Sequence, residues 1–149
     1  MTVKIVEASI IHAGIISVLH GACFEEIWNE KTISEMLNMP GILGFLIGTE
    51  DKIPQGFIMI RVAADEAEII SIGVIPAARK KGLASLLLLK SLKSAAISNV
   101  AKIFFEVAED NKAAIAFYET FGSQIIGKRS GYYKRPSKKV DAIVYSLNL

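Results

Sequence analysis

The segment best suited to chemistry is a short basic loop between an apolar strand and a leucine-rich helix. A strand is expected over residues 67–74, a helix from about Leu83, and between them the loop reads Arg79, Lys80, Lys81, Gly82. The first turn of a helix has unpaired backbone N–H groups at the positive end of its dipole. Glycine lets a ligand approach the backbone closely, and basic side chains strengthen bonds to phosphate. The loop therefore predicts a site for a ligand that carries a diphosphate.

Two common phosphate-binding motifs are excluded by the spacing of this loop. A P-loop would need a glycine five residues before Gly82 and a Ser or Thr after a Gly-Lys pair, and both are missing. The three spaced glycines of a dinucleotide-binding fingerprint are also missing. The alternative is a polar turn that only caps a core helix, and the loop alone leaves that alternative open.

Composition limits the classes of function that the chain can have. A length of 149 residues fits one domain, 1–149, which can bury about two-thirds of its unfolded surface. Charged residues make up 21% and the mean hydropathy is +0.41, so we expect a globular chain with a large core. A net charge of +2 is too small for general nucleic-acid binding. We expect no direct nucleic-acid binding, and any basic partner surface must be local.

Cys23 is the only cysteine, which excludes an internal disulfide and argues against a cysteine-ligated metal. We therefore expect a reducing, cytoplasmic location. Glu7 and His12 interrupt the apolar stretch before Cys23, so we expect no signal peptide, and no apolar run is long enough to span a membrane. Cys23 has no identifiable catalytic partner. His12 and His20 lie eight residues apart on an expected helix, where surface or capping roles are favoured over a metal site.

Hydrophobic periodicity predicts strands and helices that alternate along the chain. Strands are expected over residues 3–7, 44–49, 55–62, 67–74, 102–107, 124–126 and 142–147. Helices are expected over 10–23, 30–37, from 83 onward, and over 111–120. Asn29 and Asn111 are placed to cap two of them, and the helix from Leu83 carries leucines around most of its circumference, which predicts burial on more than one side. Turns are expected at 51–52 and 65–66, and a polar loop at 134–139. This order favours one mixed α/β sheet with helices on both faces.

A second set of residues supports a specific family. The string Ile103-Phe104-Phe105-Glu106-Val107, followed by Asn111, Ala113–Glu119 and Phe121-Gly122, resembles the second half of the Gcn5-related N-acetyltransferase (GNAT) core. The loop matches the acyl-CoA pattern of that family through Arg79, Gly82 and Ala84, where Ala84 replaces a more usual glycine. The resemblance covers nearly the whole chain. It implies a mostly antiparallel mixed sheet that splays at the cofactor site, and acetyl-CoA as co-substrate with no metal.

The resemblance also implies where acetyl-CoA binds. The pantetheine arm is expected along the end of the strand, and glycine within a strand often marks a bulge or the close approach of a ligand, although it can also be a mere weak point. Asn111 is expected to cap its helix and to bind the cofactor as well. The implied cofactor-binding residues are Ile72, Gly73, Val74, Arg79, Lys80, Lys81, Gly82, Leu83, Ala84, Ser85, Asn111 and Tyr118.

Acetyl transfer to an amine needs a base, a polarised carbonyl and an acid for the thiolate. Glu106, near the end of an apolar strand, is placed to be the base, directly or through a water. The alternative is a carboxylate that faces solvent or pairs with a lysine. Periodicity alone favours Tyr118 as a packing residue, whereas the resemblance assigns it as the general acid. Backbone N–H groups near Val74 are expected to polarise the carbonyl.

One branch of the family is especially similar. Trp28 before a short helix, Gly56-Phe57-Ile58, Tyr132-Tyr133 and Asp141-Ala142 resemble the ribosomal-protein-alanine N-acetyltransferases, which modify the N-terminal alanine of a small-subunit ribosomal protein. The implied acceptor wall is Trp28, Tyr132, Tyr133 and Asp141. Trp28 could instead pack the two N-terminal helices, and the tyrosines could simply flank a hairpin turn. An α-amino group is also easier to deprotonate than lysine near neutral pH.

Three alternatives remain open at this point. Acetylation of a protein lysine or a small amine such as a polyamine would favour an acidic groove, which the glutamates of the first two helices would allow. A non-catalytic acyl-CoA-binding module is disfavoured because both Glu106 and Tyr118 are present. The basic segment 128–139, with its two tyrosines, could dock RNA, but charge runs are more often solvated loops.

Overall fold

A seven-stranded sheet forms the centre of the computed structural model, which describes residues 2–49 and 54–149. The strands lie in the order β1-β2-β3-β4-β5-β7-β6, and among them only β4 and β5 pair in parallel. Their bounds are Val3–Glu7 (β1), Ile42–Thr49 (β2), Gly56–Ala63 (β3), Glu66–Val74 (β4), Lys102–Ala108 (β5), Gln124–Lys134 (β6) and Lys139–Asn148 (β7). The expected mixed, mostly antiparallel sheet is confirmed.

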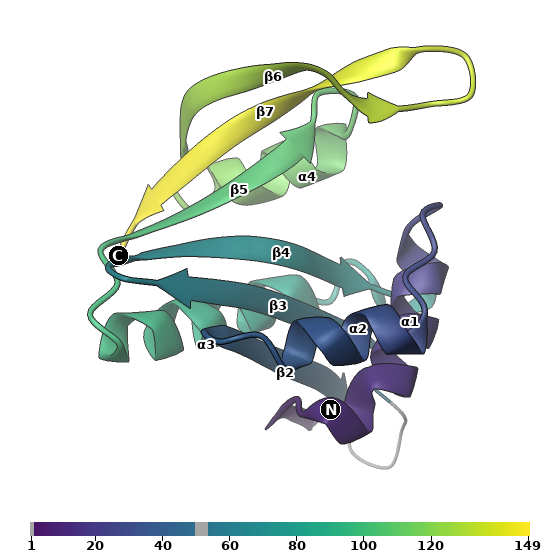
Figure 1. Cartoon of the computed structure of the whole chain (residues 1–149), viewed down its shortest axis with the longest axis vertical. Helices are drawn as coiled ribbons and strands as arrows, with labels where there is room; N and C mark the ends of the chain where they lie inside the picture. Colours follow the sequence, from purple (N-terminus) through teal and green to yellow (C-terminus); the bar gives the residue numbers. More distant parts are fainter. Residues whose placement is uncertain (1, 50–53) are drawn as a thin grey trace.

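Helices cover both faces of this sheet (Figure 1). The α-helices are α1 (Ala13–Cys23), α2 (Glu30–Leu37), α3 (Leu83–Ile97) and α4 (Lys112–Glu119), with short 3-10 turns at Ile10–His12 and Pro76–Ala78. On one face, α1 and α2 pack over β2 and β3; on the other, α3 and α4 enclose the larger core. The two-sided arrangement expected from the element order is confirmed.

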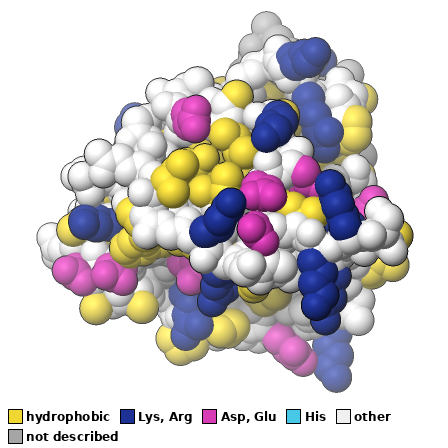
Figure 2. Space-filling model, turned by 90° about the horizontal axis from the view of Figure 1, so that it is seen from above, with side chains coloured by type: hydrophobic (Ala, Val, Ile, Leu, Met, Phe, Trp, Pro, Cys, Tyr) yellow, Lys and Arg dark blue, Asp and Glu magenta, His cyan; other side chains and the backbone are white. Residues whose placement is uncertain are grey.

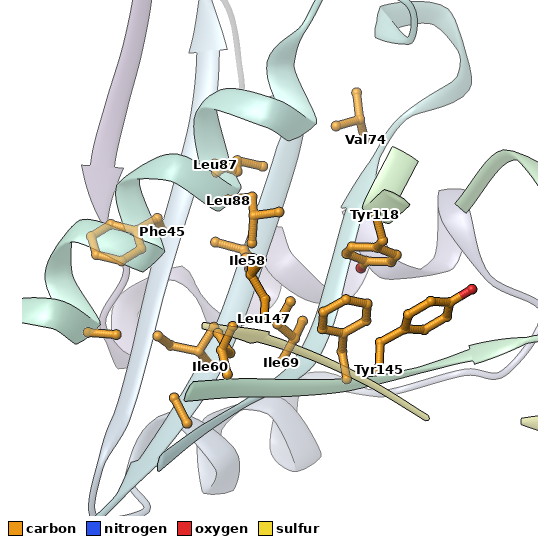
Figure 3. Close-up of a cluster of buried hydrophobic side chains, with 14 of the residues drawn as sticks. Phe45, Ile58, Ile60, Ile69, Val74, Leu87, Leu88, Tyr118, Tyr145 and Leu147 are labelled. Atoms are coloured by element: carbon orange, nitrogen blue, oxygen red, sulfur yellow. The ribbon is translucent and has the colours of Figure 1, made fainter. Parts of the chain in front are cut away.

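Alternation along the strands sends side chains into two separate cores. Phe45 and Ile47 of β2 contact the α3 side, whereas Leu46 between them contacts the α1 side. The larger core includes Val74, Tyr118 and Tyr145, which gather with leucines of α3 in Figure 3. Both faces of β2 and β3 are thus buried, and the central strands read as nearly continuous apolar runs.

Two expected helix caps are present. The Asn29 side chain accepts a hydrogen bond from the Thr32 N–H at 2.8 Å, and the Asn111 side chain accepts one from the Ala114 N–H at 3.1 Å. Each satisfies a backbone donor that the first turn leaves unpaired. The Asn111 cap fixes the start of α4 and therefore the height of Tyr118 above the sheet.

Three expectations about elements need correction or lie outside the structure. The strand expected at 124–126 is longer and extends through Lys134. Its additional part was not predicted because glycines and charged residues at its exposed positions hide the alternation of polar and apolar residues. Helix α3 buries Leu83, Leu87 and Leu88 on one side only; Leu86 and Leu89 are 39% and 44% exposed. The turn expected at 51–52 lies outside the described residues.

The prediction of a surface or capping role for the two histidines holds for one of them. The His12 Nδ1 accepts a hydrogen bond from the Ser9 N–H at 3.0 Å, a capping contact. His20, in contrast, is 2% exposed and lies between aromatic rings, with ring centroids 4.3 Å from Trp28 and 4.7 Å from Phe24. Its Nδ1 has no hydrogen-bond partner among the described residues. Helix α1 therefore uses His20 as an aromatic core residue.

Acidification is expected to destabilise the fold through His20. Burial lowers the pKa of this imidazole below its ordinary 6.5, an effect that Glu26 partly opposes. Below pH 6.5 the unfolded chain therefore binds a proton that the folded protein binds less readily, and stability falls by at most about 1.4 kcal/mol per pH unit. Urea unfolding at pH 7.5 and pH 5.5 should show a larger loss for the wild type than for His20→Phe. Equal losses would contradict the prediction.

Candidate active site

The sheet opens between β4 and β5. These strands pair only where Glu66–Glu68 of β4 faces Lys102–Phe104 of β5, and they then diverge, as Figure 1 shows. The Ile75 N–H donates a hydrogen bond to the Gln55 carbonyl and so points toward β3. Because successive N–H groups of a strand point to opposite sides, the Val74 N–H points away from β3, into the opening. The same alternation places the Ile72 N–H there. This unpaired edge of β4 can bind an extended ligand through its backbone.

At the end of this opening, the basic loop leads directly into α3. Gly82 is the N-cap residue with φ +79°, a left-handed conformation that glycine adopts without strain. Among the described residues no side chain caps the helix, and nothing lies within 4 Å of the position a Gly82 Cβ would take. The N–H groups of Leu83, Ala84 and Ser85 precede the first intrahelical bond, from Leu86 N–H to Gly82. The helix start is thus open to an anion.

The three basic residues of the loop differ in their surroundings. Arg79 Nε donates a 2.8 Å hydrogen bond to the Val74 carbonyl, so Arg79 ties the loop to the open end of β4. Lys80 and Lys81 are exposed, and Lys80 has a φ of +64°. The lysines are therefore the side chains that extend from the loop toward solvent.

Gly73 does not mark a strand bulge, one of the possibilities that its position suggested. It pairs regularly with Phe57, and the register shift of this strand pair lies instead opposite Met59 and Ile60. The close approach at Gly73 comes from within the protein: an added Cβ would lie 2.9 Å from the Cys23 Sγ. Cys23 thus packs the end of α1 against β4, and burial raises the pKa of its thiol, with Arg79 acting in the opposite direction.

Gly73→Ala is expected to destabilise the fold by about 1–3 kcal/mol, the usual cost of overpacking. The new methyl group would lie 2.9 Å from Cys23 Sγ and 3.1 Å from Phe57, so the Cys23 side chain or the packing of α1 on β4 would have to shift. Cys23→Ala in the same chain should restore part of the loss. Gly21→Ala on α1, where nothing lies within 4 Å, is the matched control and should not destabilise. Urea unfolding measures all four proteins; a neutral Gly73→Ala would contradict the prediction.

Glu106 and Tyr118 lie at the same end of β5 but on its two different faces. Phe105 and Val107 face the α3–α4 core, so Glu106 between them faces the other side. Tyr118 stacks on Phe105 with ring centroids 4.0 Å apart, and only 6% of it is exposed. Burial, with the neighbouring Tyr133, raises the pKa of Tyr118 above its ordinary value, so its hydroxyl stays protonated near neutrality. A proton acceptor and a proton donor therefore flank the strand end.

The Glu106 carboxylate has a partner that was not predicted. Its Oε1 lies 2.9 Å from Nη1 of Arg129 on β6, and 28% of the Glu106 side chain is exposed. The expected alternative, pairing with a lysine, is thus close to what is found, but the cation is an arginine. The Tyr133 hydroxyl donates a long, 3.5 Å hydrogen bond to the Glu106 carbonyl. Arg129 lies on the part of β6 beyond Ile126, where nearly every position is exposed and no alternation indicates a strand, so no local pattern indicates this pair.

The expected acceptor residues fall into two groups. Tyr132 and Tyr133 lie near the end of β6 with ring centroids 5.1 Å apart, and the Tyr133 hydroxyl reaches the Glu106 carbonyl. Asp141 faces the same strand, but its carboxylate accepts a 2.7 Å hydrogen bond from the Gly131 N–H and so shapes β6. Trp28 stacks on His20 in the α1–α2 layer, the packing alternative. Asp141 lies beside the end of β5, where its carbonyl accepts a 3.0 Å hydrogen bond from the Glu109 N–H, so it and the tyrosines border the strand end and Trp28 does not.

Ion pairs neutralise much of the basic segment 128–139. Besides Arg129, Lys128 pairs with Glu109 at 3.1 Å and Arg135 pairs with Asp110 at 3.1 Å. Figure 2 shows this mixture of acidic and basic side chains on the face that it presents. Single exposed pairs of this kind stabilise little, but three of them attach the β6–β7 hairpin to the end of β5. Within residues 128–139, all of which the structure describes, acidic partners therefore interrupt the positive charge.

The fold and the site together agree with the sequence comparison. The model of the acetyltransferase (GNAT) family matches residues 15–122. This chain belongs to the GNAT family. It is 32% identical over 120 residues, 80% of each chain, to the ribosomal protein bS18-alanine N-acetyltransferase of Escherichia coli K12.

Two solved structures have the same fold as this chain. The crystal structure of the Escherichia coli ribosomal-protein-S18-alanine N-acetyltransferase gives a TM-score of 0.91 at 26% identity, covering 99% of this GNAT chain and 94% of that one. Arabidopsis thaliana NAA60 in complex with acetyl-CoA gives 0.86 at 16% identity, covering 99% of both, which shows a shared fold alone.

Two further findings concern the described residues only. Within 2–49 and 54–149, no group of three or more His, Cys, Asp or Glu residues could hold a metal ion. In the same part of the chain, no helix is long and apolar enough to cross a membrane.

Proposed function

We propose that this GNAT acetyltransferase transfers the acetyl group of acetyl-CoA to the N-terminal alanine of a small-subunit ribosomal protein. The observation that carries the acceptor class is the 32% identity, over 80% of both chains, to an enzyme named for that reaction. The placement of Glu106 and Tyr118 on the two faces of β5 supports catalysis over mere cofactor binding. With a ribosomal protein as acceptor, we propose a cytoplasmic location for the reaction.

Acetyl-CoA fits the opening described above. Its diphosphate would accept hydrogen bonds from the open N-terminus of α3, with Lys80 and Lys81 beside it. Its pantetheine arm would lie along the unpaired edge of β4, where the N–H groups of Ile72 and Val74 point. Asn111, already the cap of α4, follows the end of β5 and would bind the cofactor from there. The thioester would then reach the end of β5.

Transfer is direct in this proposal. Glu106 accepts a proton from the acceptor ammonium, and the freed amine attacks the thioester carbonyl carbon. The Val74 N–H stabilises the negative charge on the carbonyl oxygen. The C–S bond breaks as the nitrogen loses its second proton to solvent and the amide forms, and Tyr118 donates its hydroxyl proton to the departing thiolate. Glu106 then releases its proton to solvent and Tyr118 takes one up, which restores both groups. The amine arrives from the face of β5 that carries Glu106, and the thiol departs on the face that carries Tyr118.

Release of CoA with two peptides tests the acceptor. One peptide has the mature ribosomal-protein terminus with a free alanine amine; the other is blocked at its N-terminus and carries an internal lysine. We expect turnover on the first peptide alone. Turnover on the second alone would assign the enzyme to lysine, and silence on both, with acetyl-CoA bound, would refute the proposal.

A small polyamine is the second candidate, and the charges beside Glu106 argue against it. The β6 wall of the site carries Arg129, with Lys128 and Arg135 close by in the same hairpin. Glu25 lies close enough to Arg135 to help raise the pKa of that guanidinium, but it is exposed. Each of these three cations is paired with a carboxylate, so the acidic groups beside Glu106 are already neutralised and would attract a polycation only weakly. Spermidine in the CoA-release assay tests this candidate.

A further inference from the structure

Arg129 has no role in the mechanism above, yet it makes the closest contact with the proposed base. Its Nη1 lies 2.9 Å from Oε1 of Glu106, the distance of a charge-assisted hydrogen bond. Glu106 is 28% exposed and Arg129 54% exposed, so the pair lies at the border between protein and solvent. An ion pair in such a place adds little to folding stability, so a role in the site is the better explanation for it.

The chain holds Arg129 in place by two separate devices. The guanidinium lies over the Tyr132 ring, 4.8 Å from its centroid, in a cation–π contact. The register of β6 on β7 shifts between Arg129 and Tyr133. These two residues are four positions apart on β6, but their partners on β7, Ala142 and Val140, are only two positions apart. Gly131, with φ +61°, lies in this bulge, and its N–H donates to Asp141. The bulge thereby brings both Arg129 and the Tyr132 ring to the same side of the hairpin.

We propose that Arg129 is a positioning residue that fixes the Glu106 carboxylate in the orientation needed to deprotonate the acceptor amine. Without the guanidinium, the carboxylate can turn among its side-chain rotamers and point into solvent. A misplacement of about 1 Å at a reacting group can cost a factor of about 10² in rate. With it, Oε1 is held by Arg129 and Oε2 is left for the amine proton. Tyr132 acts through Arg129, as the platform on which the guanidinium rests.

This inference rests on the proposed function, because it needs Glu106 to be the base. Arg129→Gln is expected to lower kcat by about 10- to 100-fold with the KM for acetyl-CoA within about twofold. Arg129→Lys should recover part of the loss, because an ammonium can hold one carboxylate oxygen without the planar fork. In a Glu106→Gln background, Arg129→Gln should change the rate by less than about twofold, since the group it positions is gone.

Lys128→Gln is the matched control. It removes the same charge one residue away on β6, but Lys128 pairs with Glu109 and Asp141. We expect its kcat to stay within about twofold of the wild type. An equal loss in Lys128→Gln and Arg129→Gln, an additive loss in the double variant, or a rise in kcat/KM on removing Arg129 would overturn the proposal. The last result would show that the guanidinium only blocks the acceptor.

A measurement without any acceptor separates this inference from the proposed function. In ¹⁵N-labelled protein, rotation of the Arg129 guanidinium about its Nε–Cζ bond should be slowed in the wild type and free in Glu106→Gln. Slowed rotation together with no turnover on any peptide would refute the proposed acceptor but confirm that Arg129 holds the Glu106 carboxylate. Free rotation in the wild type, or peptide turnover that Arg129→Gln leaves unchanged, would overturn the positioning role itself.

Discussion

Glu106→Gln is expected to lower the rate of acetyl transfer by about 10²- to 10⁴-fold, the range that general base catalysis supplies. Glutamine keeps the shape of the side chain but cannot accept the proton of the acceptor ammonium. The carboxylate faces away from the α3–α4 core, and the proposed cofactor contacts lie on β4 and α3. The affinity for acetyl-CoA should therefore change by less than about twofold.

Single-turnover kinetics and acetyl-CoA titration measure the two quantities separately. Glu106→Asp is the matched variant: it keeps the charge but withdraws the carboxylate from Arg129, so we expect a rate between those of the wild type and Glu106→Gln. Equal losses of rate and acetyl-CoA affinity in Glu106→Gln would exclude Glu106 as the base and assign it to the cofactor site.

Tyr118→Phe is expected to lower turnover by about 10²-fold, because the thiolate would leave without a proton donor. Only the hydroxyl is removed, and the ring keeps its contact with Phe105, 4.0 Å between centroids. Folding stability should therefore change little. Burial raises the pKa of this hydroxyl, so it remains protonated well into the alkaline range and its ionisation should not cut off activity below about pH 10.

Turnover against pH, with thermal unfolding of both proteins, checks these points. The decisive comparison is acetyl-CoA binding, which Tyr118→Phe should leave intact. An unaltered rate would remove Tyr118 from the mechanism. A weaker binding constant with an unchanged kcat would instead make it a cofactor contact, the role that its place beside the opening would also allow.

Local sequence signals predicted most of the elements that frame the site. Asn29 and Asn111 cap helices where expected, and β1 has the expected bounds. The basic loop leads into α3 at Gly82, as its composition predicts. In each case the determining interactions are made within a few residues of chain, so the sequence itself carries them.

Contacts between distant segments could not be predicted in this way. Cys23 meets Gly73 across 50 positions of chain, and Arg129 meets Glu106 from a strand whose bulge has no clear sequence signal. His20 was expected in a surface or capping role, but the rings of Phe24 and Trp28 enclose it. The acceptor side of the site depends on such contacts, and the acceptor-binding roles of Tyr132, Tyr133 and Asp141 remain predictions.

The short junction between β4 and β5 links binding to the integrity of the whole molecule. Three residue pairs join a β1–β4 half-sheet to a β5–β7–β6 half-sheet. A cofactor seated in the gap would take the place of the missing strand pairs and brace the two halves against each other. Because a ligand that binds only the folded state adds RT ln(1 + [L]/Kd) to its stability, the melting temperature of this enzyme should rise with the supply of acetyl-CoA. When acetyl-CoA is scarce, the protein would be both inactive and easier to unfold.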